Sequence, residues 1–167
     1  MDRQIITELC GYDRWATERI FDAAQDLSIE ILHNRTGAGY GPIFDTLVHL
    51  VAADVVWLSR LNGASPTSLM QPSEFRSLDD VRNRWRILHD ELASFLNQQS
   101  LDSPEKDVSY LNTQGVTFTR PIRHILLHVV NHGTHHRSEL SAMLTIAGTP
   151  PKSLDLHDYL AQIARQP

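Results

Sequence analysis

Four long segments whose apolar residues recur every three or four positions constrain the fold of this 167-residue chain most strongly. This spacing matches the 3.6-residue turn of an α-helix, so each segment has an apolar face to bury against the others. The segments cover residues 2–25, 42–62, 77–96 and 121–148. Four long helices with almost no strand predict an all-α fold, an antiparallel four-helix bundle made by residues 1–167 as a single domain.

Two shorter features complete the predicted fold. Residues 101–119 lack helical periodicity, and residues 108–110 and 116–119 flank a turn-forming Asn-Thr-Gln-Gly sequence at 112–115. This pattern predicts a small extended or hairpin segment before the fourth helix. After the Gly-Thr-Pro-Pro sequence at 148–151, Ser153 is expected to cap a short extra C-terminal helix.

Charge and composition exclude several classes of partner. The net charge is −5 with histidine neutral, and no run of lysine and arginine is present, so nucleic-acid binding is not expected. The chain starts without an apolar leader, and it has no run of about 18 apolar residues that would predict a membrane span. The single cysteine, Cys10, cannot form an internal disulfide and is expected to be a buried apolar residue. These features predict a cytoplasmic protein.

Four histidines stand four residues apart in the last long segment, at His124, His128, His132 and His136. Each step of four residues turns about 40° around the helix and climbs about 6 Å, so the four cannot share one face. On a helical wheel, His132 and His136 form the adjacent pair nearest the apolar stripe of Ile122, Leu126, Val129, Gly133, Leu140 and Leu144. This pair is therefore predicted to reach one metal ion from the same side of the helix.

A third ligand would have to come from another helix, and His49 is the candidate. It lies off the apolar stripe of its segment, yet that segment is apolar almost all round. The pattern permits His49 as a ligand without selecting it, and a histidine held by an ordinary hydrogen bond is the open alternative. Gly133 stands where an H-E-x-x-H metalloprotease has its glutamate base, so protease chemistry is not expected.

Several motifs resemble those of the DinB family. Residues 12–20 (Tyr-Asp-Arg-Trp-Ala-Thr-Glu-Arg-Ile) resemble its first helix, and residues 46–63, which include Thr-Leu-Val-His-Leu and end in Leu-Asn-Gly, resemble its second. Residues 128–137 (His-Val-Val-Asn-His-Gly-Thr-His-His-Arg) resemble the signature of its fourth helix, and residues 148–160 resemble its tail. The chain departs from the family at residues 138–139, where Ser-Glu replaces the usual Gly-Gln, and at Thr17, where asparagine is frequent.

The resemblance implies a four-helix bundle of the DinB/YfiT-like type that holds one divalent metal ion through three histidines. Carried over position by position, the ligands are His49, His132 and His136. Zinc is the expected metal, with nickel, iron and manganese as alternatives, because imidazole suits several divalent ions. Three neutral imidazoles leave a coordination position open, as in catalytic zinc sites.

The resemblance also implies a function. Members of the wider superfamily use such a metal to activate a low-molecular-weight thiol, as mycothiol-dependent isomerases and bacillithiol transferases do. The expected protein is therefore a metal-dependent enzyme, a thiol S-transferase or a hydrolase, that acts on a small molecule. The alternative is a non-catalytic, stress-related module that binds a ligand or a structural metal. A homodimer is also expected, because many bundles of this type pair through exposed helix faces.

Other polar residues near the predicted ligands are candidates for supporting roles. His128, one turn before His132, is a candidate proton shuttle because imidazole titrates near neutral pH. His135 is expected to face outward, toward solvent or a second subunit. Arg137 is a candidate both for a structural ion pair and for binding an anion. Candidates for orienting the ligands, each with a structural role as the alternative, are Asp13, Thr17, Asp54 and Glu139.

Overall fold

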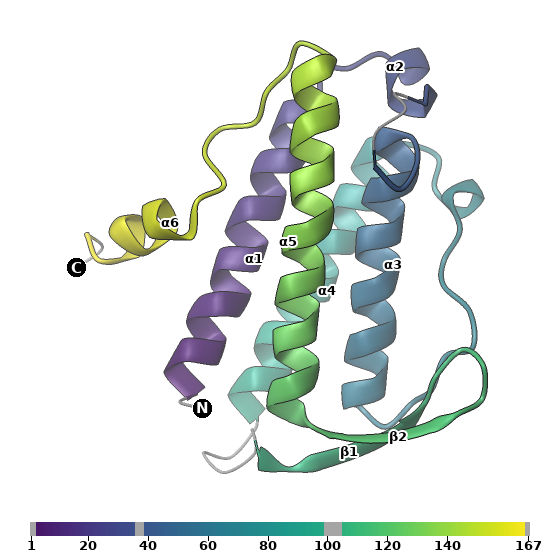
Figure 1. The fold of residues 1–167 in the computed structure, drawn as a ribbon, viewed down its shortest axis with the longest axis vertical. Helices are drawn as coiled ribbons and strands as arrows, with labels where there is room; N and C mark the ends of the chain where they lie inside the picture. Colours follow the sequence, from purple (N-terminus) through teal and green to yellow (C-terminus); the bar gives the residue numbers. More distant parts are fainter. Residues whose placement is uncertain (1–2, 36–38, 99–104, 166–167) are drawn as a thin grey trace.

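The helical periodicity of the chain produces four long helices that lie side by side in the computed structural model, which describes residues 3–35, 39–98 and 105–165 (Figure 1). These helices are α1 (Arg3–Ala24), α3 (Ile43–Leu61), α4 (Leu78–Gln98) and α5 (Ile122–Ile146). Their bounds agree with the predicted segments to within about two residues, which is the usual variation between assignments of helix ends. Asp2, in the first predicted segment, lies outside the described residues.

The directions of the helices differ from an all-antiparallel arrangement. Arg3, at the start of α1, donates a 2.9 Å hydrogen bond to the carbonyl of Leu96, near the end of α4. Arg82, early in α4, pairs with Glu18, late in α1, so α1 and α4 are antiparallel. However, α1 and α5 run in the same direction, as do α3 and α4 (Figure 1). The segment between α3 and α4 returns along the molecule before α4 begins (Figure 1), so the predicted antiparallel order of the four helices is wrong for these two pairs.

A small antiparallel sheet corrects the strict all-α class. Strands β1 (Asp107–Leu111) and β2 (Thr117–Pro121) pair with Tyr110 opposite Phe118. The turn between them is closed by Asn112, whose Oδ1 accepts from the backbone N–H groups of Gln114 and Val116. Gly115 takes a positive φ of 77° there, a conformation that glycine adopts without strain. The hairpin that the sequence predicts before the fourth helix is present.

Three short helical elements depart from the prediction. The five-residue helix α2 (Ile29–His33) and the 3₁₀ turn η1 (Pro72–Glu74) were not predicted, because each is too short to show a period. The C-terminal helix α6 (Leu156–Ile163) forms as expected, but its cap is Asp155, whose side chain accepts from His157 N, and not Ser153. The Ser153 hydroxyl instead accepts from Asp155 N, so it supports the turn that precedes the cap.

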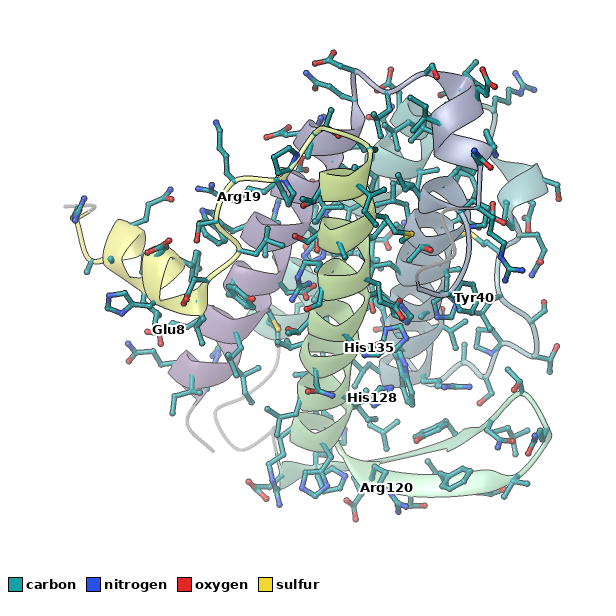
Figure 2. All side chains as sticks on the ribbon, turned by 45° about the horizontal axis from the view of Figure 1, so that its top comes forward. Glu8, Arg19, Tyr40, Arg120, His128 and His135 are labelled. Carbon is teal, nitrogen blue, oxygen red and sulfur yellow. The ribbon has the colours of Figure 1, made fainter. Side chains whose placement is uncertain are left out.

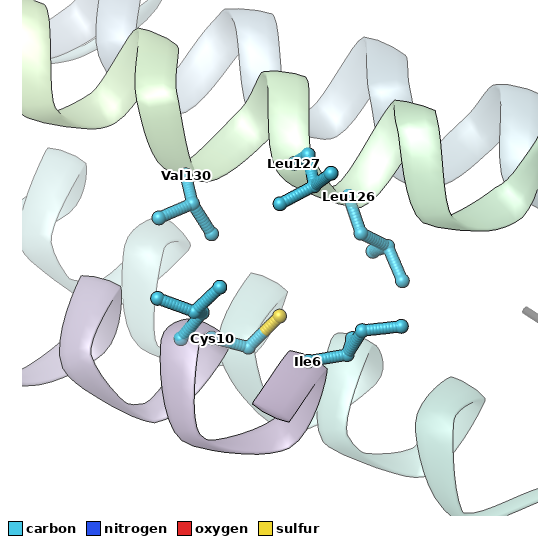
Figure 3. A pocket seen from close by; sticks show the side chains of 6 residues that line it. Ile6, Cys10, Leu126, Leu127 and Val130 are labelled. Carbon is cyan, nitrogen blue, oxygen red and sulfur yellow. The ribbon is translucent and has the colours of Figure 1, made fainter. Parts of the chain in front are cut away.

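The core lies between the four long helices. Its largest fully buried apolar side chains come from all four: Ile20 and Phe21, Ile43 and Leu47, Trp85 and Leu88, and Leu140 and Leu144. Cys10 packs among apolar side chains of α1 and α5 (Figure 3), and burial raises the pKa of its thiol to about 12. Cys10 is therefore a packing residue with little thiolate at neutral pH, as the sequence predicts. Within the described ranges, none of the helices is both long and apolar enough to span a lipid bilayer.

Candidate metal centre

Three histidines from two antiparallel helices meet on one side of the molecule. His49 comes from the second turn of α3, and His132 and His136 come from the middle of α5. One ring nitrogen of each lies within 4.8 Å of a ring nitrogen of both others. The ring centroids are 4.5 Å apart for His132 and His136, 4.7 Å for His49 and His136, and 5.4 Å for His49 and His132. The structure therefore brings together the three residues that the sequence analysis selected as ligands.

The surroundings of His49 and His132 favour their neutral form. Burial, together with the charges of neighbouring histidines, His136 first, lowers the pKa of His132 to about 3. Burial also lowers the pKa of His49, and the neighbouring His136 lowers it further. A neutral imidazole has a free lone pair, which is the form that binds metal ions. All three rings are half-buried or buried, so the cluster is partly shielded from solvent.

Glu139 orients one of the three rings. Its Oε2 lies 2.7 Å from His136 Nδ1. The proton of the ring is therefore assigned to Nδ1, which donates a hydrogen bond to Glu139. Nε2 of His136 then keeps its lone pair. A carboxylate that accepts from the second nitrogen of a histidine is a recurrent partner of metal-binding histidines. Among the residues proposed for such a role, Glu139 is the one that contacts a histidine of the cluster.

Tyr40 forms a wall of the site that the sequence analysis missed. Its ring stacks on His49 with centroids 4.3 Å apart and meets His136 edge-on at 6.0 Å. Tyr40 is 56% exposed and comes from the connector before α3 (Figure 2). The same connector passes against α5 at Gly39, where an added Cβ would lie 3.2 Å from Glu139 Cβ. A tyrosine within a glycine-rich connector was the available signal, but its position depends on how that connector folds back.

His128 lies at the edge of the site and does not join the cluster. It is exposed, and its ring centroid is 5.8 Å from that of His132 and 4.7 Å from that of Trp57. Partial burial lowers the pKa of His128, and the positive charge of Arg60 lowers it further. His128 is thus a neutral base near neutral pH, next to the cluster.

His135 faces outward as expected. Its side chain is 67% exposed, and Nε2 lies 3.4 Å from Oε1 of Glu139. The same carboxylate therefore contacts two consecutive histidines, with one oxygen toward each.

A second polar cluster lies deep between the helices. Arg137 donates from Nη1 to Oδ1 of Asp13 and, at 3.1 Å, to Thr17 Oγ1. His89 of α4 places Nε2 3.7 Å from Asp13 Oδ2, and the carboxyl of Asp54 from α3 lies in the same group. Arg137 therefore forms the structural ion pair of its two predicted alternatives, and Asp13 and Thr17 contact Arg137 and not the three histidines. We call Asp13, Asp54, His89 and Arg137 the buried acidic cluster.

Burial controls protonation within the buried acidic cluster. Desolvation raises the pKa of Asp54 well above its usual value, and the charge of Asp13 raises it further. Neither carboxyl oxygen of Asp54 has a hydrogen-bond partner among the described residues. Burial lowers the pKa of His89 to about 3, so this ring is neutral. Sequence analysis missed His89, which interrupts the apolar face of α4 and contacts Trp85 at a centroid distance of 3.8 Å.

Gly133 allows the two clusters to coexist on α5. A Cβ at this position would lie 2.5 Å from Asp13 Oδ1 and 2.6 Å from Arg137 Nη1. The absence of a side chain therefore makes room for the Asp13–Arg137 pair between α1 and α5. Because Gly133 directly follows His132, the packing of this pair helps to set the position of the histidines.

Comparison with known proteins identifies a family and a relative of this chain. A family model described as the DinB family matches residues 1–166. The protein called "Protein DinB" of Bacillus subtilis (strain 168) is 27% identical to this chain over 160 residues, which is 92% of this chain and 92% of that protein.

Proposed function

Because the chain belongs to the DinB family, we propose that it binds one divalent metal ion through His49, His132 and His136 and is an enzyme that acts on a small molecule. The observation that carries this proposal is the convergence of three ring nitrogens within 4.8 Å of one another on two helices. Imidazole is a ligand for zinc, nickel and iron, with zinc the first choice for such a set.

The residues present fit a metal ion. Nδ1 of His132 is buried and has no hydrogen-bond partner among the residues that the structure describes. An unsatisfied polar atom of this kind is rare in proteins, and a bound ion is one explanation for it. Glu139 holds the Nδ1 proton of His136 and leaves the opposite nitrogen free to bind. The three imidazole rings would bind in their neutral form, so they would supply lone pairs and leave the positive charge of the metal ion unneutralised.

The composition of the cluster supports an open site. In the described part of the chain, the group around His49 and His132 contains three histidines and no fourth ligand, whereas structural zinc sites are usually closed by four protein ligands. Cys10, the one cysteine, is buried between α1 and α5 in apolar surroundings. The alternative of a structural metal in a non-catalytic module therefore has less support than the enzyme.

We propose thiol S-transfer or hydrolysis as the reaction. A divalent ion with an open position polarises a carbonyl group or lowers the pKa of a bound water or thiol toward neutral pH. His128, neutral and exposed beside His132, is placed to accept a proton from a group that approaches the cluster. Tyr40 covers His49 and limits access from one side. A low-molecular-weight thiol is the proposed co-substrate.

Metal analysis tests the first part of the proposal. Protein purified without a nickel column is expected to carry about one divalent ion per chain, and His132→Ala is expected to carry much less. His124→Ala, which alters an exposed histidine of the same helix, is the matched control and is expected to retain the ion. Equal metal content in all three proteins would contradict the assignment of His132.

A turnover screen tests the second part. Wild type and His132→Ala are compared with low-molecular-weight thiols and electrophiles, and with ester and amide substrates. Turnover that depends on His132 and on the metal is the expected result. Metal binding without turnover on any of these classes would favour the structural alternative.

Further proposals concern the whole chain. We propose that α1, α3, α4 and α5 form a four-helix bundle within a single domain of residues 1–167, because side chains from all four build one core. We also propose a homodimer and a cytoplasmic location, with no nucleic acid or membrane as partner. Sedimentation of the purified protein tests the dimer.

A further inference from the structure

Arg60 of α3 is a buried cation without an anionic partner. The residue is 6% exposed, and its guanidinium carbon lies 4.5 Å from the ring centroid of Trp57 and 4.9 Å from that of Tyr110. Its Nε is buried and has no hydrogen-bond partner, and no carboxylate in residues 3–35, 39–98 or 105–165 pairs with it. Burying a charge is unfavourable unless it is paired, so the protein maintains Arg60 in a position that an anion would stabilise.

A cavity of about 350 Å³ lies against Arg60. Its lining includes Ala53, Trp57 and Arg60 from α3, and Tyr110, Asn112 and Phe118 from the hairpin. The volume lies in the range of small-molecule sites, and the aromatic walls with few polar groups match their usual composition. None of the lining residues is acidic, so within the described chain the charge next to the cavity is that of Arg60.

The cavity lies on the same side of α3 as His49. Ala53, Trp57 and Arg60 follow His49 at intervals of four, eight and eleven residues, so they share its side of α3. Trp57 contacts His128, which in turn lies beside His132. The distance along α3 from His49 to Trp57 is roughly 12 Å for eight residues. From His49 to Arg60 the rise along α3 is roughly 17 Å for eleven residues, so a small molecule elongated along this face would span the two.

We propose that this cavity binds the anionic end of the substrate or co-substrate, a carboxylate or phosphate group held by Arg60, while the reactive end lies at the three histidines. This inference rests on the proposed function. A guanidinium presents a planar fork of donors that matches the oxygens of either group. Trp57 and Tyr110 hold the fork in place and line the path of the connecting carbon chain. Arg60 is thus a specificity-determining residue and takes no part in the chemical step.

Thiols that differ in their distal group test this inference. Zinc-loaded protein is titrated with mercaptohexanoate, mercaptohexyl phosphate and mercaptohexanol, and the dissociation constants are measured by calorimetry. Wild type is expected to bind at least one of the two anionic thiols about tenfold more tightly than the alcohol, which corresponds to about 1.4 kcal/mol. The comparison of the two anions shows which group the site prefers.

Arg60→Gln is expected to abolish this preference while binding the alcohol as wild type does. Arg19→Gln is the matched control, because Arg19 also stacks on a tryptophan, at 3.9 Å from the Trp15 ring, but lies on α1 away from the cavity. It is expected to keep the preference. Circular dichroism and melting verify that both variants fold. If Arg60→Gln does not fold, Arg60→Lys is used, and a severalfold reduction of the preference is expected because the planar fork is lost.

The outcomes separate the inference from the proposed function. Equal affinity of wild type for all three thiols overturns the inference and leaves the metal site intact. A preference for the anions that persists in Arg60→Gln or Arg60→Lys also overturns it. If no thiol binds to the zinc-loaded protein, the open metal site itself is wrong, and the inference fails with it.

Discussion

The three-histidine site and the buried acidic cluster both hold three ligand-type side chains within 4.8 Å of one another, yet their surroundings differ. The three histidines are partly accessible as a group, and burial lowers the pKa of His49 and His132, which favours their neutral form. The acidic cluster is fully buried and already contains the guanidinium of Arg137. Under the proposed function, residue type and spacing alone do not define the metal site. Charge balance and access decide between the two clusters.

Charge balance explains why the buried acidic cluster is structural. Asp13 is paired with Arg137, and burial raises the pKa of Asp54 well above its usual value, which favours its uncharged form. A divalent ion there would face the positive charge of Arg137 and would have to lose its water. The hydrogen bonds of Arg137 to Asp13 and Thr17 instead join α5 to α1, and Asp54 of α3 and His89 of α4 pack beside them. The predictions below test this division of roles, in order of decreasing expected effect.

Arg137→Ala is expected to lower the free energy of unfolding by about 3–5 kcal/mol, because removing one partner leaves the other buried charge unpaired. Urea unfolding monitored by circular dichroism measures the change. Arg14→Ala, which breaks an exposed pair with Asp90, is the control and is expected to change stability by less than about 1 kcal/mol. A small effect of Arg137→Ala would show that the buried cluster does not hold the helices together.

Acid is expected to destabilise the fold through His89. Its pKa is near 3 in the folded protein and near 6.5 when unfolded, so the unfolded state binds the proton first as the pH falls. The contribution of neutral, buried His89 to the free energy of unfolding is complete above pH 6.5. It is lost as the pH falls toward 3, at up to about 1.4 kcal/mol per pH unit. The stability advantage of wild type over His89→Gln should therefore shrink on acidification through this window. An advantage that does not change with pH contradicts burial of a neutral His89.

Gly133→Ala is expected to destabilise the protein by about 1–3 kcal/mol, because the added methyl group overlaps the Asp13–Arg137 pair. Thermal unfolding measures the effect. Gly41→Ala is the matched control, since a Cβ there makes only an ordinary 3.6 Å contact with Asp45. Equal melting temperatures for the two variants would mean that α1 and α5 separate easily at Gly133.

Glu139→Ala is expected to weaken metal binding by about 10- to 100-fold with little change in stability, because His136 loses the carboxylate that orients it. Competition with a chelating dye measures the affinity. Asp54→Asn is the control from the other cluster and is expected to leave the affinity unchanged. If Asp54→Asn weakens metal binding as much as Glu139→Ala does, the division between the clusters is wrong.

The parts of the structure that depend on local pattern were predictable from the sequence. The four long helices follow from apolar periodicity, and the wheel selected His132 and His136 because both lie on one helix. The hairpin followed from its turn sequence. The direction of α5 relative to α1 was not predictable in the same way, because it depends on the path of the connections.

Residues that depend on packing between distant segments were harder to predict. His49 was permitted by its helix but was selected by resemblance to a family. Tyr40, Arg60 and His89 were not identified as site or cluster residues, because their partners lie on other elements. Asp13 and Thr17 were assigned near the histidines, whereas they contact Arg137. The sequence gives residue types and faces, and the fold decides which faces meet.

X-ray absorption spectroscopy of the zinc-loaded protein tests the central claim most directly, because it counts the ligands of the ion. The account predicts three imidazole nitrogens and one light-atom ligand from solvent, with the imidazole signal reduced in His49→Ala. A zinc ion surrounded mainly by carboxylate oxygens, or an unchanged spectrum in His49→Ala, would contradict it.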